Sequence, residues 1–141
     1  QAELRPGVSE LFADLKASGV PVALVTSSVR PMVEAFLSRL PEGTFDAVVT
    51  ANDVENHNPD PEPYLRAAQL LGVDPAGCVV LEDSPSGIGS GLAAGTRVVA
   101  IPCIVPLPAQ DGLSRIGSAA DLNIPLLEEI AAGSVVDWLD D

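Results

Sequence analysis

Two groups of oxygen-bearing side chains follow apolar runs in this sequence. The first, Thr26-Ser27-Ser28, comes directly after the run from Val20 to Val25. Hydroxyls and free backbone N–H groups at the start of a helix can bind an anion. Ser27 or Ser28 could equally cap the helix that follows, and the two roles are compatible. This segment therefore predicts an anion site, a helix cap, or both.

The second group is the acidic pair Glu82-Asp83, which follows the apolar run Cys78 to Leu81. Adjacent carboxylates at the end of a buried strand repel each other unless a cation lies between them. Mg²⁺ usually takes one or two carboxylates and keeps several waters. The alternative is that Asp83 or Ser84 caps the next helix while Glu82 is solvated. We favour the magnesium site.

Other segments carry weaker chemical signals. Residues 58–64, Asn-Pro-Asp-Pro-Glu-Pro-Tyr, predict an extended entry into a helix because alternate prolines fix the backbone. His57 is the only histidine, so no site that needs two can be built, and we interpret it as a solvated loop residue. The glycines of residues 87–91 only approximate a dinucleotide-binding fingerprint, since the third comes one residue early.

The elements that must position these groups alternate along the chain. Helical patterns cover 6–18, 31–40, 61–71, 86–94 and 124–132, and apolar strand patterns cover 20–25, 47–50, 78–81 and 97–101, with a further short strand in the tail. This alternation predicts a single α/β domain over 1–141, a three-layer α/β/α Rossmann-like parallel sheet. Chemistry in such sheets lies beyond the carboxyl ends of the strands, so the two groups should meet there.

Composition limits the possible partners. The chain has 141 residues, with seven basic against twenty acidic side chains and a net charge of -13. A hydrophobic share of 47% allows a packed core and excludes general disorder. The charge argues against nucleic acid and against anionic membranes, and a bound phosphate would need a metal cation to offset the repulsion. We expect Cys78 to be buried, Cys103 to be packed, and the protein to be cytoplasmic, because two cysteines make no disulfide framework and no signal-peptide pattern is visible.

Together these segments resemble the haloacid dehalogenase superfamily, in its β-phosphoglucomutase and phosphoglycolate-phosphatase branch. Residues 22–28 resemble the family's second motif, a strand that ends in Ser or Thr. Residues 58–64 resemble the third, usually Lys-Pro-x-Pro-x-x-Tyr, and residues 79–88 resemble the fourth. Arg5 to Val8 resembles the entry to the core domain after a helical cap. The resemblance covers roughly residues 4–131.

The resemblance implies a Mg²⁺-dependent phosphatase, or a phosphomutase, acting on a small phosphorylated metabolite. Thr26 would bind the phosphoryl oxygens with the Ser27 N–H, and Ser28 would lie in the same cradle. Asp83 would bind Mg²⁺, with Glu82 bound directly or through a water. Asn58 stands where the family keeps a catalytic Lys, and Arg30 or His57 could supply the missing charge.

The sequence also departs from the family pattern. The family's Asp nucleophile lies in an N-terminal Asp-x-Asp-Gly motif that this chain does not contain. We expect that motif and the cap upstream of residue 1, or on a partner chain, unless the enzyme is degenerate. The chain alone should then be inactive, with the central strand missing between 22–25 and 78–81, and it should self-associate or take a strand from another segment.

A different class of function stays open beside the enzyme. A non-catalytic phosphate-binding or interaction module would keep the fold without the nucleophile and the Lys. A response-regulator receiver domain is disfavoured, because it needs a late Lys and the only lysine is Lys16.

Overall fold

The computed structural model describes residues 8–101 and 107–139. The α-helices are α1 (Val8–Ala17), α2 (Arg30–Leu37), α3 (Glu62–Leu71), α4 (Pro85–Ala93) and α5 (Ile124–Ala131). The strands are β1 (Ala23–Val25), β2 (Ala47–Val49), β3 (Val79–Glu82), β4 (Arg97–Ala100) and β5 (Ser114–Arg115). The predicted alternation of helices and strands is confirmed. Two expectations, for Cys103 and for the entry at Arg5 to Gly7, fall outside the described residues.

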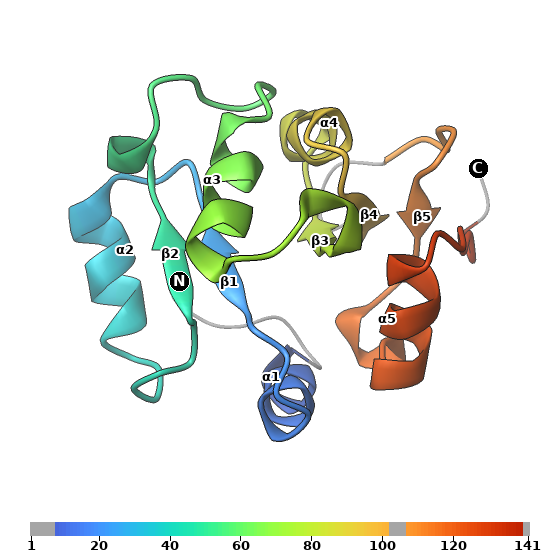
Figure 1. Cartoon of the computed structure of the whole chain (residues 1–141), viewed down its shortest axis with the longest axis horizontal. Coiled ribbons are helices and arrows are strands. Elements are labelled where there is room, and N and C mark those ends of the chain that lie inside the picture. The colour runs from blue at the N-terminus through green and yellow to red at the C-terminus, as the bar shows by residue number, and fades with distance from the viewer. Residues whose placement is uncertain (1–7, 102–106, 140–141) are drawn as a thin grey trace.

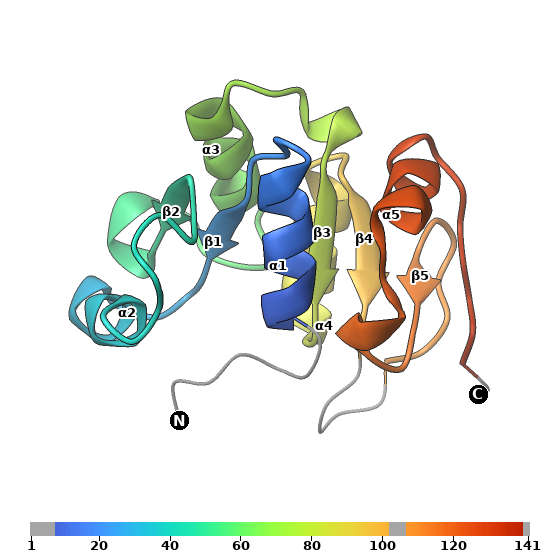
Figure 2. The same cartoon turned by 90° about the horizontal axis from the view of Figure 1, so that it is seen from below.

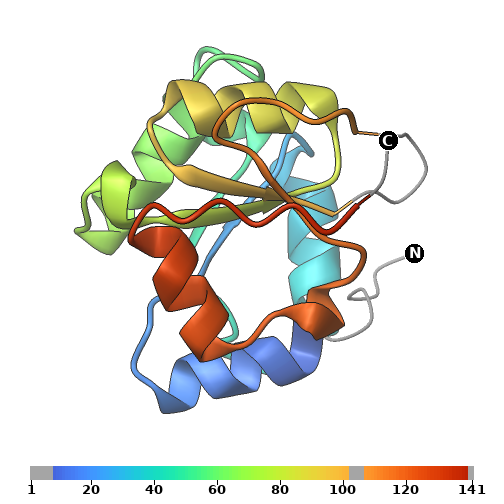
Figure 3. The ribbon, with the colours of Figure 1, turned by 90° about the vertical axis from the view of Figure 1, so that its right-hand side faces the viewer.

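The larger sheet has the order β3-β4-β5, with all its pairs parallel. Helix α4 covers one face of this sheet, and α1 and α5 cover the other (Figure 3). Right-handed crossovers between parallel strands produce this placement of helices on both faces. The mixed α/β architecture with three layers agrees with the fold class expected from the sequence.

Strand β4 is the centre of the core because both of its faces are buried. Val98 and Ala100 pack in one apolar cluster with Ile88 of α4. Val99 and Ile101 pack in a second cluster on the opposite face, together with Leu11 of α1. Side chains alternate between the faces of a strand, so a continuous apolar run is what a doubly covered parallel strand requires.

A second, separate sheet contains only β1 and β2, paired in parallel. Helix α3 contacts both of these strands. Within the described residues β1 and β3 share no backbone pairing, and Figure 1 shows the two sheets apart at this point. In Figure 2 the β1–β2 pair lies on one side of α1 and the larger sheet on the other. The break between the two sheets lies where the sequence predicts a missing strand, between the strand ending at Val25 and β3. That a further strand belongs there stays a prediction.

Several local expectations are wrong. The strand predicted over 20–25 is limited to Ala23–Val25, and its residues are only half-buried. Strand β1 pairs only with β2, so one of its edges has no partner strand in the described chain. Cys78 is half-buried rather than buried, and it precedes β3.

No helix in the described ranges is long and apolar enough to cross a membrane.

Candidate active site

A pocket of about 190 Å³ lies where the carboxyl ends of β1 and β3 face each other. Its lining contains Val25, Thr26, Ser27, Val54, His57, Asn58, Pro63, Glu82, Asp83 and Ser84. Three segments far apart in sequence contribute to it. The predicted site residues Thr26, Ser27, Asn58, Glu82 and Asp83 therefore lie together, while their chemical roles stay predictions.

The backbone of the loop after β1 is hydrogen-bonded to the Thr26 hydroxyl. The Ser28 N–H donates a hydrogen bond of 3.1 Å to Thr26 Oγ1. Ser27 lines the pocket, and no described residue accepts its N–H. Ser28 is not among the residues that line the pocket. Neither serine caps α2: the N-cap is Val29, without a side-chain hydrogen bond, so that alternative is wrong.

The same loop is fastened to the segment that follows β2. The Ala51 N–H donates to the Ser28 carbonyl at 3.0 Å, and the Arg30 N–H donates to Asn52 Oδ1 at 2.8 Å. The Arg30 guanidinium pairs with Asp53 at 2.5 Å. The hydrogen bond from Arg30 lowers the pKa of Asp53 to about 2, with help from the Thr50 N–H. Arg30 is thus directed at Asp53 and does not line the pocket.

Glu82 is held in place by its own chain. Its carboxylate accepts hydrogen bonds from the Tyr64 hydroxyl, from the Asp83 N–H at 3.2 Å and from Ser84 Oγ at 3.3 Å. Burial raises the pKa of the Tyr64 hydroxyl far above its ordinary value, and the nearby Glu82 charge adds to the rise. A Cβ at Gly87 would lie 2.1 Å from the Glu82 carboxyl carbon. The glycine therefore provides the space that this carboxylate occupies.

The Asp83 carboxylate, in contrast, is exposed and has no hydrogen-bond or ion-pair partner among the described residues. It does not cap the next helix; Ser84 does, by accepting the Gly87 N–H at 3.1 Å. No group of three or more His, Cys, Asp or Glu side chains that could hold a metal ion occurs in the described ranges. A free carboxylate beside a fixed one fits Mg²⁺, which needs only one or two such ligands from a chain.

The loop that carries Asn58 is anchored on two helices. Glu62 of α3 accepts the N–H groups of Glu55 at 2.9 Å and Asn56 at 3.0 Å. Ser90 of α4 donates to the Asp60 carbonyl at 2.6 Å. These contacts set Asn58 and His57 at the pocket wall.

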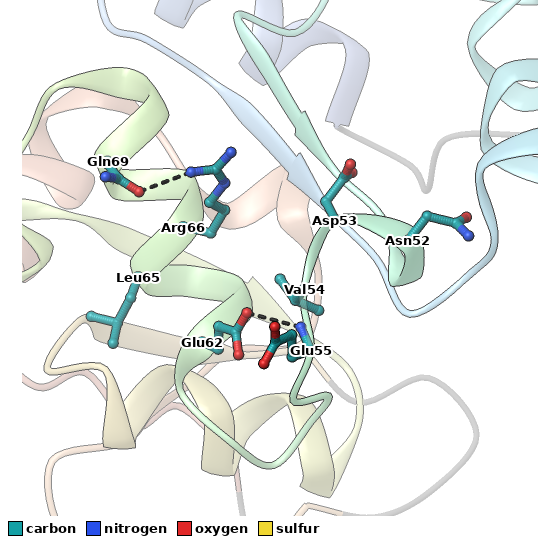
Figure 4. Close-up of a pocket in the computed structure, with 8 residues that line it drawn as sticks. All are labelled: Asn52, Asp53, Val54, Glu55, Glu62, Leu65, Arg66 and Gln69. Carbon is teal, nitrogen blue, oxygen red and sulfur yellow. Dashed lines mark hydrogen bonds between the residues drawn. The ribbon is translucent and has the colours of Figure 1, made fainter.

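A larger pocket of about 640 Å³ lies between the 52–55 segment and α3 (Figure 4). Two of its three acidic side chains are already engaged: Glu62 accepts two backbone N–H groups, and Asp53 pairs with Arg30. Arg66 donates to Gln69 at 3.1 Å. None of the residues predicted to bind phosphate or metal lines this pocket, so it is not the candidate active site.

Sequence reasoning missed the contacts that support the site. In the sequence, Tyr64 stands out only as the last residue of the third motif, and Gly87 only as part of the fourth motif and of a glycine-rich segment. Their shared role around Glu82 depends on α3 meeting the β3–α4 turn, which no local pattern shows. The buried Arg115, which binds Asp137 through two contacts of 3.0 Å, had no sequence signal either.

The sequence of the chain is similar to sequences of known proteins. The sequence pattern of the haloacid dehalogenase-like hydrolases matches residues 1–101. A bifunctional riboflavin kinase/FMN phosphatase of Arabidopsis thaliana is 38% identical over 96% of this chain and 36% of its own length.

Two solved structures are similar in fold. A HAD hydrolase, family IA, variant 3, from Entamoeba histolytica HM-1:IMSS superposes with a TM-score of 0.85 and 26% identity, over 92% of this chain and 61% of that one. CbbY from Rhodobacter sphaeroides, solved in complex with phosphate, superposes with a TM-score of 0.77 and 31% identity, over 84% and 55%. The chain thus spans about one third to three fifths of the length of these proteins.

Proposed function

The chain belongs to the haloacid dehalogenase-like hydrolases, and from this premise we propose that it carries the phosphate and Mg²⁺ site of a phosphatase for a small phosphorylated metabolite. A phosphotransferase of the mutase type is the closest variant of this proposal. The main support for this proposed function is that one pocket is lined by Thr26, Ser27, Asn58 and the pair Glu82-Asp83.

Each residue has a physical task in this proposal. The Thr26 hydroxyl and the unused Ser27 N–H donate hydrogen bonds to phosphoryl oxygens. Donors that are already in position stabilise the negative charge that develops on these oxygens during the reaction. The Asn58 amide donates another. Asp83 holds the metal, while Glu82, fixed by Tyr64, orients the water around it. Mg²⁺, when bound, supplies the positive charge that offsets the phosphate and the acids.

The nucleophile is proposed to come from a segment outside the 141 residues. By family resemblance it is an Asp at the end of an apolar strand, which would be phosphorylated and then hydrolysed. The unpaired edges of β1 and β3 are the place for such a strand. Its carboxyl end would then open into the same pocket. We propose on this basis that the chain alone is catalytically silent.

The experiment compares two proteins from the natural gene. One is this 141-residue chain; the other also carries whatever the reading frame encodes upstream. Both are assayed with an aryl phosphate and Mg²⁺. We expect hydrolysis by the longer protein only, and slower hydrolysis by its Asp83→Asn variant at the same limiting Mg²⁺ concentration.

Two other outcomes would revise the proposal. Hydrolysis by the short chain that disappears in Asp83→Ala would show that the chain holds its own nucleophile. A longer protein that binds phosphate yet hydrolyses no phosphate ester would favour the alternative function, a non-catalytic phosphate-binding module.

A further inference from the structure

The charge balance of the pocket calls for a cation from the protein. Glu82 and Asp83 bring two negative charges to its wall, and a phosphoryl group adds more. Two like charges about 4 Å apart repel by about 4 kcal/mol at the effective dielectric of a protein surface. One Mg²⁺ offsets part of this. A further positive side chain facing the phosphoryl group would therefore strengthen binding.

Nearly all basic side chains of the described residues lie elsewhere. None of the lysine and arginine residues in these ranges lines the pocket: Lys16, Arg30, Arg39, Arg66, Arg97 and Arg115. Several have partners of their own. Lys16 donates to the Gly43 carbonyl, Arg30 pairs with Asp53, and Arg115 pairs with Asp137. This leaves His57, which lines the pocket beside Asn58.

We propose that His57 supplies the positive charge that faces the phosphoryl group, taking over the task that Asn58 cannot perform. This inference rests on the proposed function and adds one residue to it. A protonated imidazole donates a charge-assisted hydrogen bond to a phosphate oxygen. Asn58 contributes an amide hydrogen bond without charge. The adjacent pair would therefore provide, from two side chains, the hydrogen bond and the positive charge that one lysine ammonium provides.

The ionisable side chains around His57 are acidic. The pKa of the Glu62 carboxyl in α3 is lowered, mainly because this carboxyl accepts a hydrogen bond from the Glu55 N–H. The imidazole of His57 is close enough to contribute to the same decrease. Glu82 and Asp83 face the same pocket from the β3–α4 turn. The loop after β1 presents only the neutral Thr26 and Ser27. Every ionisable group that faces His57 in the described chain is thus an acid, so no like charge opposes a cation at this position.

A histidine cation makes the site dependent on pH. Histidine side chains change charge between about pH 5 and 8, so phosphate should bind more tightly on the acid side of that range. A charge-assisted hydrogen bond at an exposed position corresponds to about tenfold in affinity. A lysine side chain would keep its charge over the same range, so the pH dependence left in a lysine variant would come from phosphate, which also changes charge near neutral pH.

The test uses the 141-residue chain with inorganic phosphate and Mg²⁺, observed by nuclear magnetic resonance. His57 is the only histidine, so its ring Cε1–H signal is assigned without ambiguity. Phosphate should move this signal and the Thr26 and Ser27 amides together, whereas chloride at equal ionic strength should not. His57→Gln should weaken binding about tenfold near pH 6 and little near pH 8. His57→Lys should keep tight binding at both.

The control is Arg66→Gln, which removes a full positive charge from the neighbouring pocket of Figure 4. It should leave phosphate affinity unchanged. If phosphate moves the Thr26 and Ser27 amides while the His57 ring signal stays still and His57→Gln binds normally, the histidine proposal is wrong and the phosphate site stands. If phosphate moves none of these signals, the phosphate site itself is refuted, and the histidine proposal with it.

Discussion

Replacing Tyr64 by Phe tests the contact that fixes Glu82. Tyr64 is buried, with 8% of its surface exposed, and its hydroxyl donates to the Glu82 carboxylate. Phe fills the same space without leaving a cavity, so the change removes mainly this hydrogen bond.

The expected loss can be worked from the remaining contacts. A hydrogen bond to a charged group is worth about 1.5–3 kcal/mol. Glu82 keeps the Asp83 N–H and Ser84 Oγ, but at 3.2 and 3.3 Å both are long. We therefore expect Tyr64→Phe to lower the free energy of unfolding by about 1–2 kcal/mol, measured by urea denaturation at neutral pH.

A double-mutant cycle isolates the pair. Glu82→Gln alone and Tyr64→Phe alone should not add in the double variant, and the coupling should be about 1 kcal/mol. Additive effects, with a Tyr64→Phe loss below about 0.3 kcal/mol, would refute the contact.

The raised pKa of Tyr64 gives the same prediction a pH signature. The folded state holds the phenol proton more tightly than the unfolded chain, so this contribution is complete below the ordinary pKa of 10.0 and is lost as the pH rises above it. Tyr64 is the only tyrosine, so its ultraviolet absorbance reports ionisation directly. A phenol that ionises at its ordinary pKa in the folded protein would contradict the burial. Tyr64→Phe should remove this part of the alkaline sensitivity.

Three further variants probe the site's surroundings. Gly87→Ala should displace Glu82 and lower the free energy of unfolding by about 1–3 kcal/mol in urea denaturation. The control is Gly77→Ala, whose Cβ meets nothing within 4 Å and which should be neutral. Equal effects of the two variants would contradict the close approach of Gly87 to the Glu82 carboxylate. Asp53 has a lowered pKa of about 2, so its pairing with Arg30 stabilises the fold above pH 4 and is lost as the pH falls towards 2; Asp53→Asn should flatten this part of the acid unfolding curve by less than about 1 kcal/mol, and an unchanged curve would count against the pair. Asn58→Lys in the longer protein should raise kcat/KM near pH 8, by up to about a hundredfold. The proposed histidine cation predicts a smaller gain near pH 6, since histidine side chains gain charge towards acid pH. No change at either pH would mean that residues 58–61 do not correspond to the third motif.

Local sequence patterns predicted the elements of the fold well. Continuous apolar runs marked β3 and β4 because a doubly covered strand needs no polar residues. Ser84 was recognised as a possible cap from its type and place, and the structure confirms it. The meeting of Thr26 and Asp83 could be predicted too, because the carboxyl ends of parallel strands share one edge; Asn58 is expected there only from the family resemblance.

Contacts between distant segments could not be predicted. The extent of β1 depends on which strands pair with it, and among the described residues it pairs only with β2. The choice between Arg30 and His57 as the pocket's cation was open in the sequence. It depends on Asp53, which lies 23 residues from Arg30 and binds its guanidinium. Such outcomes are decided by tertiary packing and not by residue type.

The most direct measurement of the central claim is the Mg²⁺ dependence of activity in the longer protein with and without the Asp83 carboxylate. If Asp83 holds the metal at the phosphate pocket, Asp83→Asn should raise the Mg²⁺ concentration for half-maximal activity by at least about tenfold. Arg66→Gln, outside the pocket, should not change it. An Asp83→Asn protein with the wild-type Mg²⁺ dependence and the wild-type kcat/KM would contradict the account.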